Sequence, residues 1–141
     1  MTKWNTTGTI VPIKIIADTN TFIAVALNEP EKDKIIRLTE GHELIAPEVL
    51  PFEIGNALTA MIKKNTLSKS EVISAWEAIQ KIPVDLRNTD IKSALIIAMQ
   101  FKIYGYDAYF LDCAVKLRSP LLSLDHGIQR VAQELGITIL E

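Results

Sequence analysis

Four carboxylate side chains stand in apolar stretches of the sequence, far apart along the chain. An ionised carboxylate among apolar neighbours costs several kcal/mol, roughly, unless a cation or hydrogen-bond donors compensate its charge. Two of these acids directly follow apolar, strand-like runs. Parallel strands would place both at the same edge of a sheet, where open α/β folds bind ligands. We interpret the set as a divalent-cation site made of Asp18, Glu53, Asp107 and Asp125.

Two of the acids end β-branched or leucine-rich runs. Asp18 closes Ile-Ile-Ala-Asp, and Asn20 follows two residues later. Asp125 closes Leu-Leu-Ser-Leu-Asp, with Ser123 one strand period earlier on the same side. The simpler interpretation of either acid is a helix N-cap. Capping and ligation are compatible, because a helix N-terminus also helps to hold a phosphate oxygen.

The other two acids belong to helical patterns. Glu53 interrupts an apolar helical face, and Asn56 lies three residues later on the same side. Its simpler interpretation is a partly exposed edge residue, which the apolar neighbours Phe52 and Ile54 disfavour. Asp107 follows Tyr-Gly-Tyr and opens an apolar helix, where capping is again the alternative.

Hard oxygen ligands select Mg²⁺ or Mn²⁺ rather than zinc. The chain has only two histidines, His42 and His126, and neither has ligand spacing with the single cysteine. Mg²⁺ keeps several waters and takes one or two protein carboxylates. We expect Asp18 and Asp107 as direct ligands, with the other two acids acting through water or on a second ion.

Composition limits the class of protein. The 141 residues suit one domain, which we place at residues 13–141 after a polar leader at residues 1–12. A net charge of -2 excludes a generally basic nucleic-acid binder. The hydrophobic content of 48% predicts apolar surface buried against a second chain, as in a homodimer. One cysteine, no secretory pattern and no apolar run of about twenty residues predict a cytoplasmic protein without a membrane span.

Short strands alternate with longer helices along the sequence. This order predicts an α/β fold, a three-layer α/β/α domain with a short, mainly parallel central sheet. Asn88 or Thr89 is the expected cap of the helix that ends near Phe101. Ser68 and Glu71 form a capping box. The expected strands are residues 13–17, 44–46, 84–86, 120–124 and 137–140, and the expected helices include residues 19–27, 31–40, 47–64, 68–81 and 127–135.

The order of the acidic motifs resembles that of the PIN-domain ribonucleases, most closely the toxin subunits of the VapC type. The resemblance extends from about Ile13 to Leu140, and its most specific segments are APEVLPFEIGNAL and YDAYFL. It implies a PIN-like fold and a metal-dependent endoribonuclease that is inhibited by a cognate antitoxin. It also implies an acidic site with hydrogen-bonding companions that orient carboxylates or a phosphate. The acids would be Asp18, Glu53, Asp107 and Asp125, and the companions Asn20, Asn56 and Ser123.

Two features depart from the family pattern: the polar leader, and Asp112 where a small or apolar residue is usual. Asp112 could be a surface residue or an additional outer acid of the site. A basic rim for flanking RNA phosphates is also expected. Its candidates are Lys63, Lys64, Lys69, Lys116 and Arg118.

Two other functions remain open at this point. A strand-end aspartate such as Asp18 also serves as the covalent nucleophile of phosphatases, although Asn20 stands where a second aspartate is preferred. The fold could also be a catalytically degenerate module that binds RNA or protein without turnover.

Overall fold

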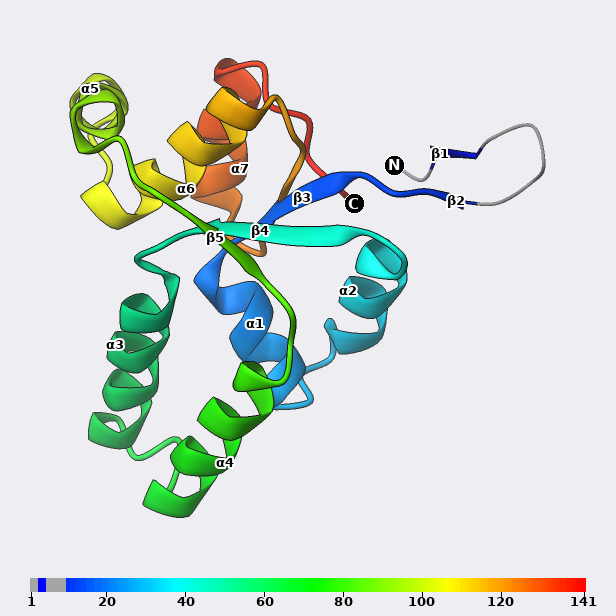
Figure 1. Ribbon diagram of the computed structural model, residues 1–141. Helices are drawn as coiled ribbons and strands as arrows, with labels where there is room; N and C mark the ends of the chain where they lie inside the picture. Colours follow the sequence, from blue (N-terminus) through cyan, green and yellow to red (C-terminus); the bar gives the residue numbers. More distant parts are fainter. Residues whose placement is uncertain (1–2, 5–9) are drawn as a thin grey trace.

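The computed structural model describes residues 3–4 and 10–141, and its centre is a four-stranded parallel sheet (Figure 1). The strand order is β5-β4-β3-β6, and each neighbouring pair is parallel. The prediction of a short, parallel central sheet is therefore confirmed. The strands are β3 (Lys14–Ala17), β4 (Glu43–Pro47), β5 (Asp85–Arg87) and β6 (Leu121–Leu122).

Helices cover both faces of the sheet, which gives the expected three layers (Figure 1). One face carries α5 (Ile91–Phe101), α6 (Gly105–Leu117) and α7 (His126–Glu134). The other carries α1 (Thr19–Ala26), α2 (Lys32–Thr39), α3 (Leu50–Lys63) and α4 (Lys69–Gln80). None of the helices in the described parts of the chain is long and apolar enough to cross a membrane.

The central strand β3 forms because its side chains are apolar on both faces. Ile15, Ile16 and Ala17 are each 0% exposed, as expected for a parallel strand between two helical layers. The chain then leaves the sheet at Asp18, which begins α1 as its N-cap. The burial that fixes β3 therefore also fixes the position of this acid.

Of the predicted starts of α4, α5 and α6, one agrees with the structure and two do not. The capping box of Ser68 and Glu71 is present at α4. Helix α5 is capped by Asp90, whose side chain accepts from the Ser93 backbone N–H, so the expectation of Asn88 or Thr89 was wrong. Asp107 does not cap α6 either, because the helix begins two residues earlier at Gly105.

The ends of the chain differ from the predicted strands. Only Leu121 and Leu122 of the expected strand at 120–124 pair within the sheet. The expected strand at 137–140 is reduced to one bridge between Leu121 and Ile139. Near the N-terminus, β1 (Lys3–Trp4) pairs antiparallel with β2 (Ile10–Val11). Residues 1–2 and 5–9 of the predicted leader at residues 1–12 lie outside the described residues.

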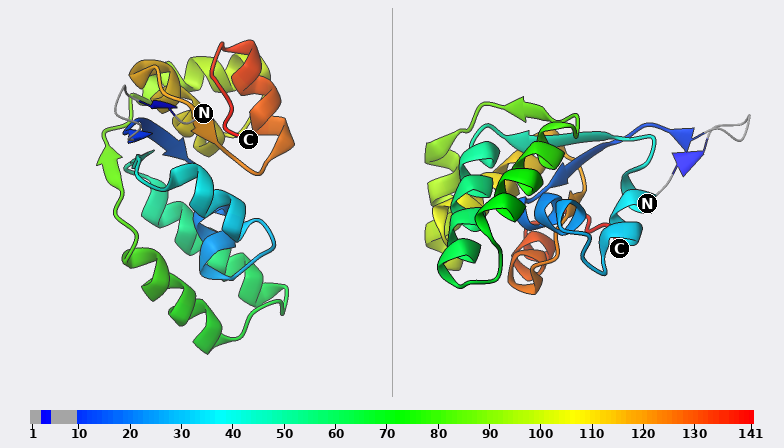
Figure 2. Two further views of the ribbon diagram at one scale, coloured as in Figure 1. Left: turned by 90° about the vertical axis from the view of Figure 1, so that its right-hand side faces the viewer. Right: turned by 90° about the horizontal axis from the view of Figure 1, so that it is seen from below.

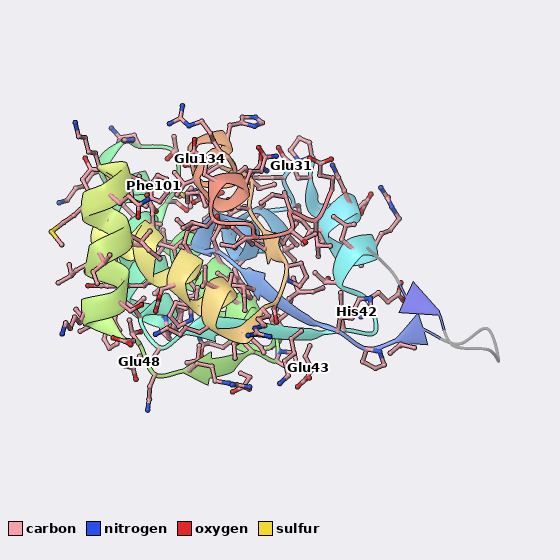
Figure 3. All side chains as sticks on the ribbon, turned by 90° about the horizontal axis from the view of Figure 1, so that it is seen from above. Glu31, His42, Glu43, Glu48, Phe101 and Glu134 are labelled. Atoms are coloured by element: carbon pink, nitrogen blue, oxygen red, sulfur yellow. The ribbon has the colours of Figure 1, made fainter. Side chains whose placement is uncertain are left out.

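A histidine ties the beginning of the domain to the sheet. The backbone N–H of Ile13 donates to Nδ1 of His42 at 3.1 Å. Figure 3 shows His42 between α2 and the start of β3. The backbone N–H of Glu43 in turn donates to the Ile13 carbonyl at 3.0 Å. These bonds fix the register in which β3 enters the sheet beside β4.

Candidate active site

The four acids predicted from the sequence line one small cavity, here called the acidic cavity, at the carboxyl edge of the sheet. Asp18 follows β3 and Asp125 follows β6, and these strands are parallel neighbours. Glu53 comes from the first turn of α3 and Asp107 from the first turn of α6. The cavity has a volume of about 110 Å³, and Asn20 also lines it. The fold thus brings four distant parts of the chain to one place.

Asp18 is the most buried of the four acids, with 4% of its surface exposed. Its Oδ1 accepts the Thr21 hydroxyl at 2.8 Å and the Thr21 backbone N–H at 3.3 Å. Its Oδ2 accepts the hydroxyl of Ser123. Donors on both oxygens compensate the cost of burying this carboxylate and fix its orientation.

Ser123 connects two of the acids. While its hydroxyl donates to Asp18, its Oγ accepts the backbone N–H of Asp125 at 3.1 Å. Asp125 caps α7 by accepting the backbone N–H of Ile128 at 3.0 Å. The N-cap interpretation is correct for Asp18 and Asp125, and both carboxylates nevertheless face the acidic cavity.

Glu53 occupies a half-buried position on α3 and accepts a hydrogen bond from the Asn56 amide at 3.3 Å. Asn56 itself is exposed and does not line the acidic cavity. The apolar neighbour Phe52 is 74% exposed, so flanking apolar residues did not indicate burial here. Asn56 is therefore placed to orient Glu53 from outside the cavity.

Two of the acids, Asp18 and Asp107, have a raised pKa. Burial raises the pKa of Asp18, hydrogen bonds from Ser123 and Thr21 lower it, and the charge of Asp125 raises it again. Burial and then the charges of the other three acids raise the pKa of Asp107 to about 6. Mutual repulsion of this kind is relieved when a cation binds among the carboxylates.

The donors of the acidic cavity fit a hard dication. Its polar lining is made of carboxylate, amide and hydroxyl groups, without histidine or cysteine. Thr19 lines it as well, and its buried Oγ1 has no hydrogen-bond partner among residues 3–4 and 10–141. Within those residues, no three Asp, Glu, His or Cys side chains are placed so that they could hold a metal ion by themselves. One or two carboxylates completed by waters, the usual arrangement for Mg²⁺, would be compatible with this cavity.

Asp112 is neither a surface residue nor part of the acidic cavity. It is 4% exposed and accepts the Ser93 hydroxyl at 2.6 Å, between α5 and α6. Lys116 lies 3.8 Å from it, one turn further along α6. The surface interpretation was therefore wrong, and the hydrogen-bond partner of Asp112 belongs to another helix rather than to the acidic cavity.

None of the five candidates for a basic rim lines the acidic cavity itself. Lys116 forms an ion pair with Asp90 at 2.8 Å, near the end of α6 opposite Asp107. Helices α3 and α4 extend side by side away from the sheet (Figures 1 and 2), and Lys63 and Lys64 lie at the distal end of α3. At a rise of about 1.5 Å per residue, these helix ends lie roughly 15 Å from the acids on the same helices.

Sequence reasoning did not single out Thr21 and Gln129. Thr21 is buried and holds Asp18, and its position three residues after an N-cap is the available sequence signal. Gln129 donates from Nε2 to the Ser123 carbonyl at 2.6 Å and so holds the turn that carries Asp125. No local pattern indicates this contact.

A comparison with protein-family models decides the family. The model described as PIN domain matches residues 15–134, which include all four acids. The chain belongs to the PIN-domain family. The resemblance inferred from the acidic motifs is thereby confirmed.

Individual relatives of this PIN domain are distant. Ribonuclease VapC3 of Pyrobaculum aerophilum is 23% identical over 121 residues, covering 82% of this chain and 92% of VapC3. The crystal structure of PAE2754 from Pyrobaculum aerophilum has a TM-score of 0.62 at 16% identity, covering 88% of this chain and 90% of that one. VapBC2 from Rickettsia felis, solved bound to a DNA fragment from its promoter, has a TM-score of 0.60 at 11% identity, covering 92% and 98%. The two solved structures support the fold.

Proposed function

We propose that this PIN domain is a metal-dependent endoribonuclease that hydrolyses RNA phosphodiester bonds. The observation that carries the proposal is the convergence of four carboxylates on one cavity at the carboxyl edge of a parallel sheet. The distant similarity to ribonuclease VapC3 supports the same activity. We assign Mg²⁺ or Mn²⁺ as the cofactor because the donors are hard oxygens.

Asp18 and Asp107 are the proposed direct metal ligands. A bound dication would lower the pKa of a water ligand and offset negative charge on the phosphate as the bond to the leaving oxygen breaks. Thr21 and Ser123 hold the Asp18 carboxylate in one orientation. The exposed amide of Asn20, at the edge of the cavity, is placed to donate to a phosphate oxygen. The expected products carry a 5′-phosphate and a 3′-hydroxyl.

Glu53 and Asp125 have a supporting role in this proposal. Both line the acidic cavity and are less buried than Asp18, so they reach its solvent side. Acting through water or on a second ion, their carboxylates orient the attacking water or accept its proton. Asn56 fixes Glu53, and Ser123 fixes the backbone of Asp125.

The biological role we propose is the toxin of a type II toxin–antitoxin pair. Similarity to VapC3 and to the VapBC2 complex supports this role. A cognate antitoxin would inhibit the enzyme by placing a basic side chain against the carboxylates, since the acidic cavity attracts positive charge. RNA and an antitoxin are therefore the proposed partners, and the cytoplasm is the proposed location.

A homodimer is the proposed assembly, and the outer side of α5 is its proposed contact. Four large apolar side chains of this helix are solvent-exposed, with Met99 71% exposed, and Tyr104 just beyond the helix is 82% exposed. Large apolar side chains that are exposed together on one helix mark a protein–protein contact site. A stable interface uses about 800 Å² per partner, and this face is the proposed centre of one. The four residues of α5 are Ile91, Leu95, Ile96 and Met99.

Cleavage of a fluorescent RNA tests the proposed activity. Wild-type protein is expected to cut a mixed-sequence oligoribonucleotide in Mn²⁺ or Mg²⁺ and to stop in excess chelator. Asp18→Asn and Asp107→Asn should each lower kcat/KM by at least about 100-fold while circular dichroism remains native. Asp33→Asn, an exposed acid on α2, is the matched control and should cut normally. Equal cleavage by wild type and both cavity variants would contradict the mechanism.

Two alternatives make different predictions. A phosphatase would form a phospho-aspartate at Asp18, but this carboxylate is hydrogen-bonded on both oxygens and no lysine lines its cavity. Trapping such an adduct would nevertheless favour a phosphatase. A degenerate binding module would bind RNA or a protein without binding Mn²⁺, and calorimetry distinguishes it from the nuclease.

A further inference from the structure

A second cavity, here called the side cavity, lies next to the acidic cavity. Its volume is about 350 Å³, within the size range of small-molecule sites. The turn and first helical residues from Ser123 to Gln129 form the wall between the two cavities. Asp125 and Ile128 line the acidic cavity, whereas His126 and Gln129 line the side cavity. Neighbouring residues of one short segment therefore line the two cavities, which places them side by side.

The floor of the side cavity is apolar and made of core residues. Ile35 of α2, Leu122 of β6 and Leu140 are 3–4% exposed core residues that line it. An apolar floor of this kind accepts a flat, weakly polar group and does not favour a phosphate. Of the parts of a nucleotide, the base therefore fits this floor better than the phosphate does.

The rim of the side cavity offers polar groups and one aromatic ring. Exposed side chains of Glu31, Lys34 and His126 stand at its edge. Figure 3 shows Glu31 between α2 and α7. A carboxylate and an ammonium can bond the amino and carbonyl groups of a base edge, and histidine rings stack on unpaired bases.

Gln129 holds this rim in place. Its Nε2 donates to the Ser123 carbonyl at 2.6 Å, and its Oε1 lies 3.3 Å from Nδ1 of His126. The same side chain thus fixes the turn and restrains the imidazole ring. Ser123, whose carbonyl accepts this bond, also donates its hydroxyl to Asp18 in the acidic cavity.

We infer that the side cavity binds one unstacked RNA base, that of a nucleotide adjoining the cleaved bond, and that the His126 ring stacks on it. The inference rests on the proposed ribonuclease function and deepens it, since it assigns a determinant of RNA specificity. Single-stranded RNA is read in this way, with bases turned out and held on aromatic side chains.

The test combines removal of the base with removal of the ring. Wild-type protein and His126→Ala are assayed on short oligoribonucleotides that carry one abasic site, moved in turn to each position on either side of the cleaved bond. In wild type, one position should lower kcat/KM by about tenfold or more, because stacking of a base on an aromatic ring has this magnitude. In His126→Ala, the same abasic site should have little further effect.

Two variants control for indirect effects. His126→Phe keeps a ring that can stack and should restore most of the sensitivity to the abasic site. Arg130→Ala changes an exposed residue of α7 that lines neither cavity, and it should behave like wild type. Equal abasic losses in wild type and His126→Ala, or no sensitive position in wild type, would overturn the inference.

A binding measurement separates this inference from the proposed function. The probe is an RNA with 2-aminopurine at the sensitive position, or at each position in turn. It is titrated into the Asp107→Asn protein and into the double variant that also carries His126→Ala, and the two fluorescence changes are compared. A change that depends on His126 supports the base site. If the fluorescence change depends on His126 but wild-type protein does not cleave RNA, only the ribonuclease proposal is contradicted. If the fluorescence change does not depend on His126, the base site is overturned.

Discussion

The Asp18 carboxylate performs two tasks at one position. It caps α1 through the Thr21 backbone N–H and faces the acidic cavity at the same time. The two tasks do not compete, because Oδ2 accepts only the Ser123 hydroxyl and keeps acceptor capacity free, while Oδ1 accepts both Thr21 donors. A helix cap is thus compatible with metal ligation here, as the sequence suggested.

The raised pKa of Asp107 predicts how metal-free stability depends on pH. A carboxylate whose pKa is about 6 in the folded protein and 3.8 in the unfolded chain binds more protons when folded within that window. In chelator, the melting temperature should therefore rise by a few degrees as the pH falls from 7 towards 5.

Differential scanning fluorimetry of wild type against Asp107→Asn isolates this contribution. The variant has no carboxylate to protonate at this position, so the rise on acidification should be smaller in it than in wild type. A rise of equal size in both proteins would show that Asp107 is not the responsible group.

At the scale of residues, the sequence predicted the four acids that line the acidic cavity and two of their hydrogen-bonding companions, Ser123 and Asn56, but not their other contacts. Asp18 and Asp125 follow apolar runs, which is a local signal. Asp112 could not be placed, since its burial depends on Ser93, a residue of another helix that only the folded structure brings near. The Gln129 contact with the Ser123 carbonyl is likewise a product of the fold.

Helix α6 carries one acid of the acidic cavity and, further along, residues that attach it to another helix. Asp107 in its first turn lines the acidic cavity, while Asp112 and Lys116 further along attach α6 to α5. Ser93 and Asp90 supply the α5 side of this attachment. The two acids of α6 should therefore respond differently to substitution.

Replacing Asp112 tests this separation. Asp112→Ala removes a buried hydrogen bond and leaves the Ser93 hydroxyl unpaired, which should lower the free energy of unfolding by about 2 kcal/mol. Urea unfolding measures this loss, and Mn²⁺ affinity of the folded variant should stay at the wild-type value. The control Glu77→Ala, on the exposed side of α4, should change stability by less than about 0.5 kcal/mol. A stable Asp112→Ala protein that has lost Mn²⁺ binding would contradict this assignment.

At the scale of elements, the helices were easier to predict than the short strands. Helix α4 has a local capping box and apolar periodicity, and both were visible in the sequence. Strand β6 pairs through only Leu121 and Leu122, because Ser123 turns out of the sheet to bond Asp18. A five-residue apolar run could not reveal where this turn begins.

The whole molecule presents one large apolar helix face. If α5 forms the dimer contact, Met99→Glu should convert the dimer into a monomer, because it places a charge at the most exposed position of that face. Light scattering coupled to size-exclusion chromatography measures the mass. Ile73→Glu changes a residue of α4 that is 57% exposed and should leave the dimer intact. A wild-type monomer, or a dimer that survives Met99→Glu, would contradict the assignment of this face.

The parallel sheet determines where the acids of the acidic cavity lie in the whole molecule. Strands β3 and β6 deliver Asp18 and Asp125 to one edge, and the first turns of α3 and α6 add Glu53 and Asp107. The parallel arrangement was predictable from the alternation of strands and helices. The approach of the two helices depends on packing and was supplied in advance only by the family resemblance.

Isothermal titration of Mn²⁺ into the folded protein tests the central claim most directly. Wild type should bind Mn²⁺, and Asp18→Asn and Asp107→Asn should each weaken binding by at least about tenfold, because each removes a proposed ligand. The matched control Asp112→Asn, a buried acid outside the acidic cavity, should bind as wild type does. Absence of binding by wild type, or equal affinity in all four proteins, would contradict the assignment of these carboxylates as a divalent-cation site.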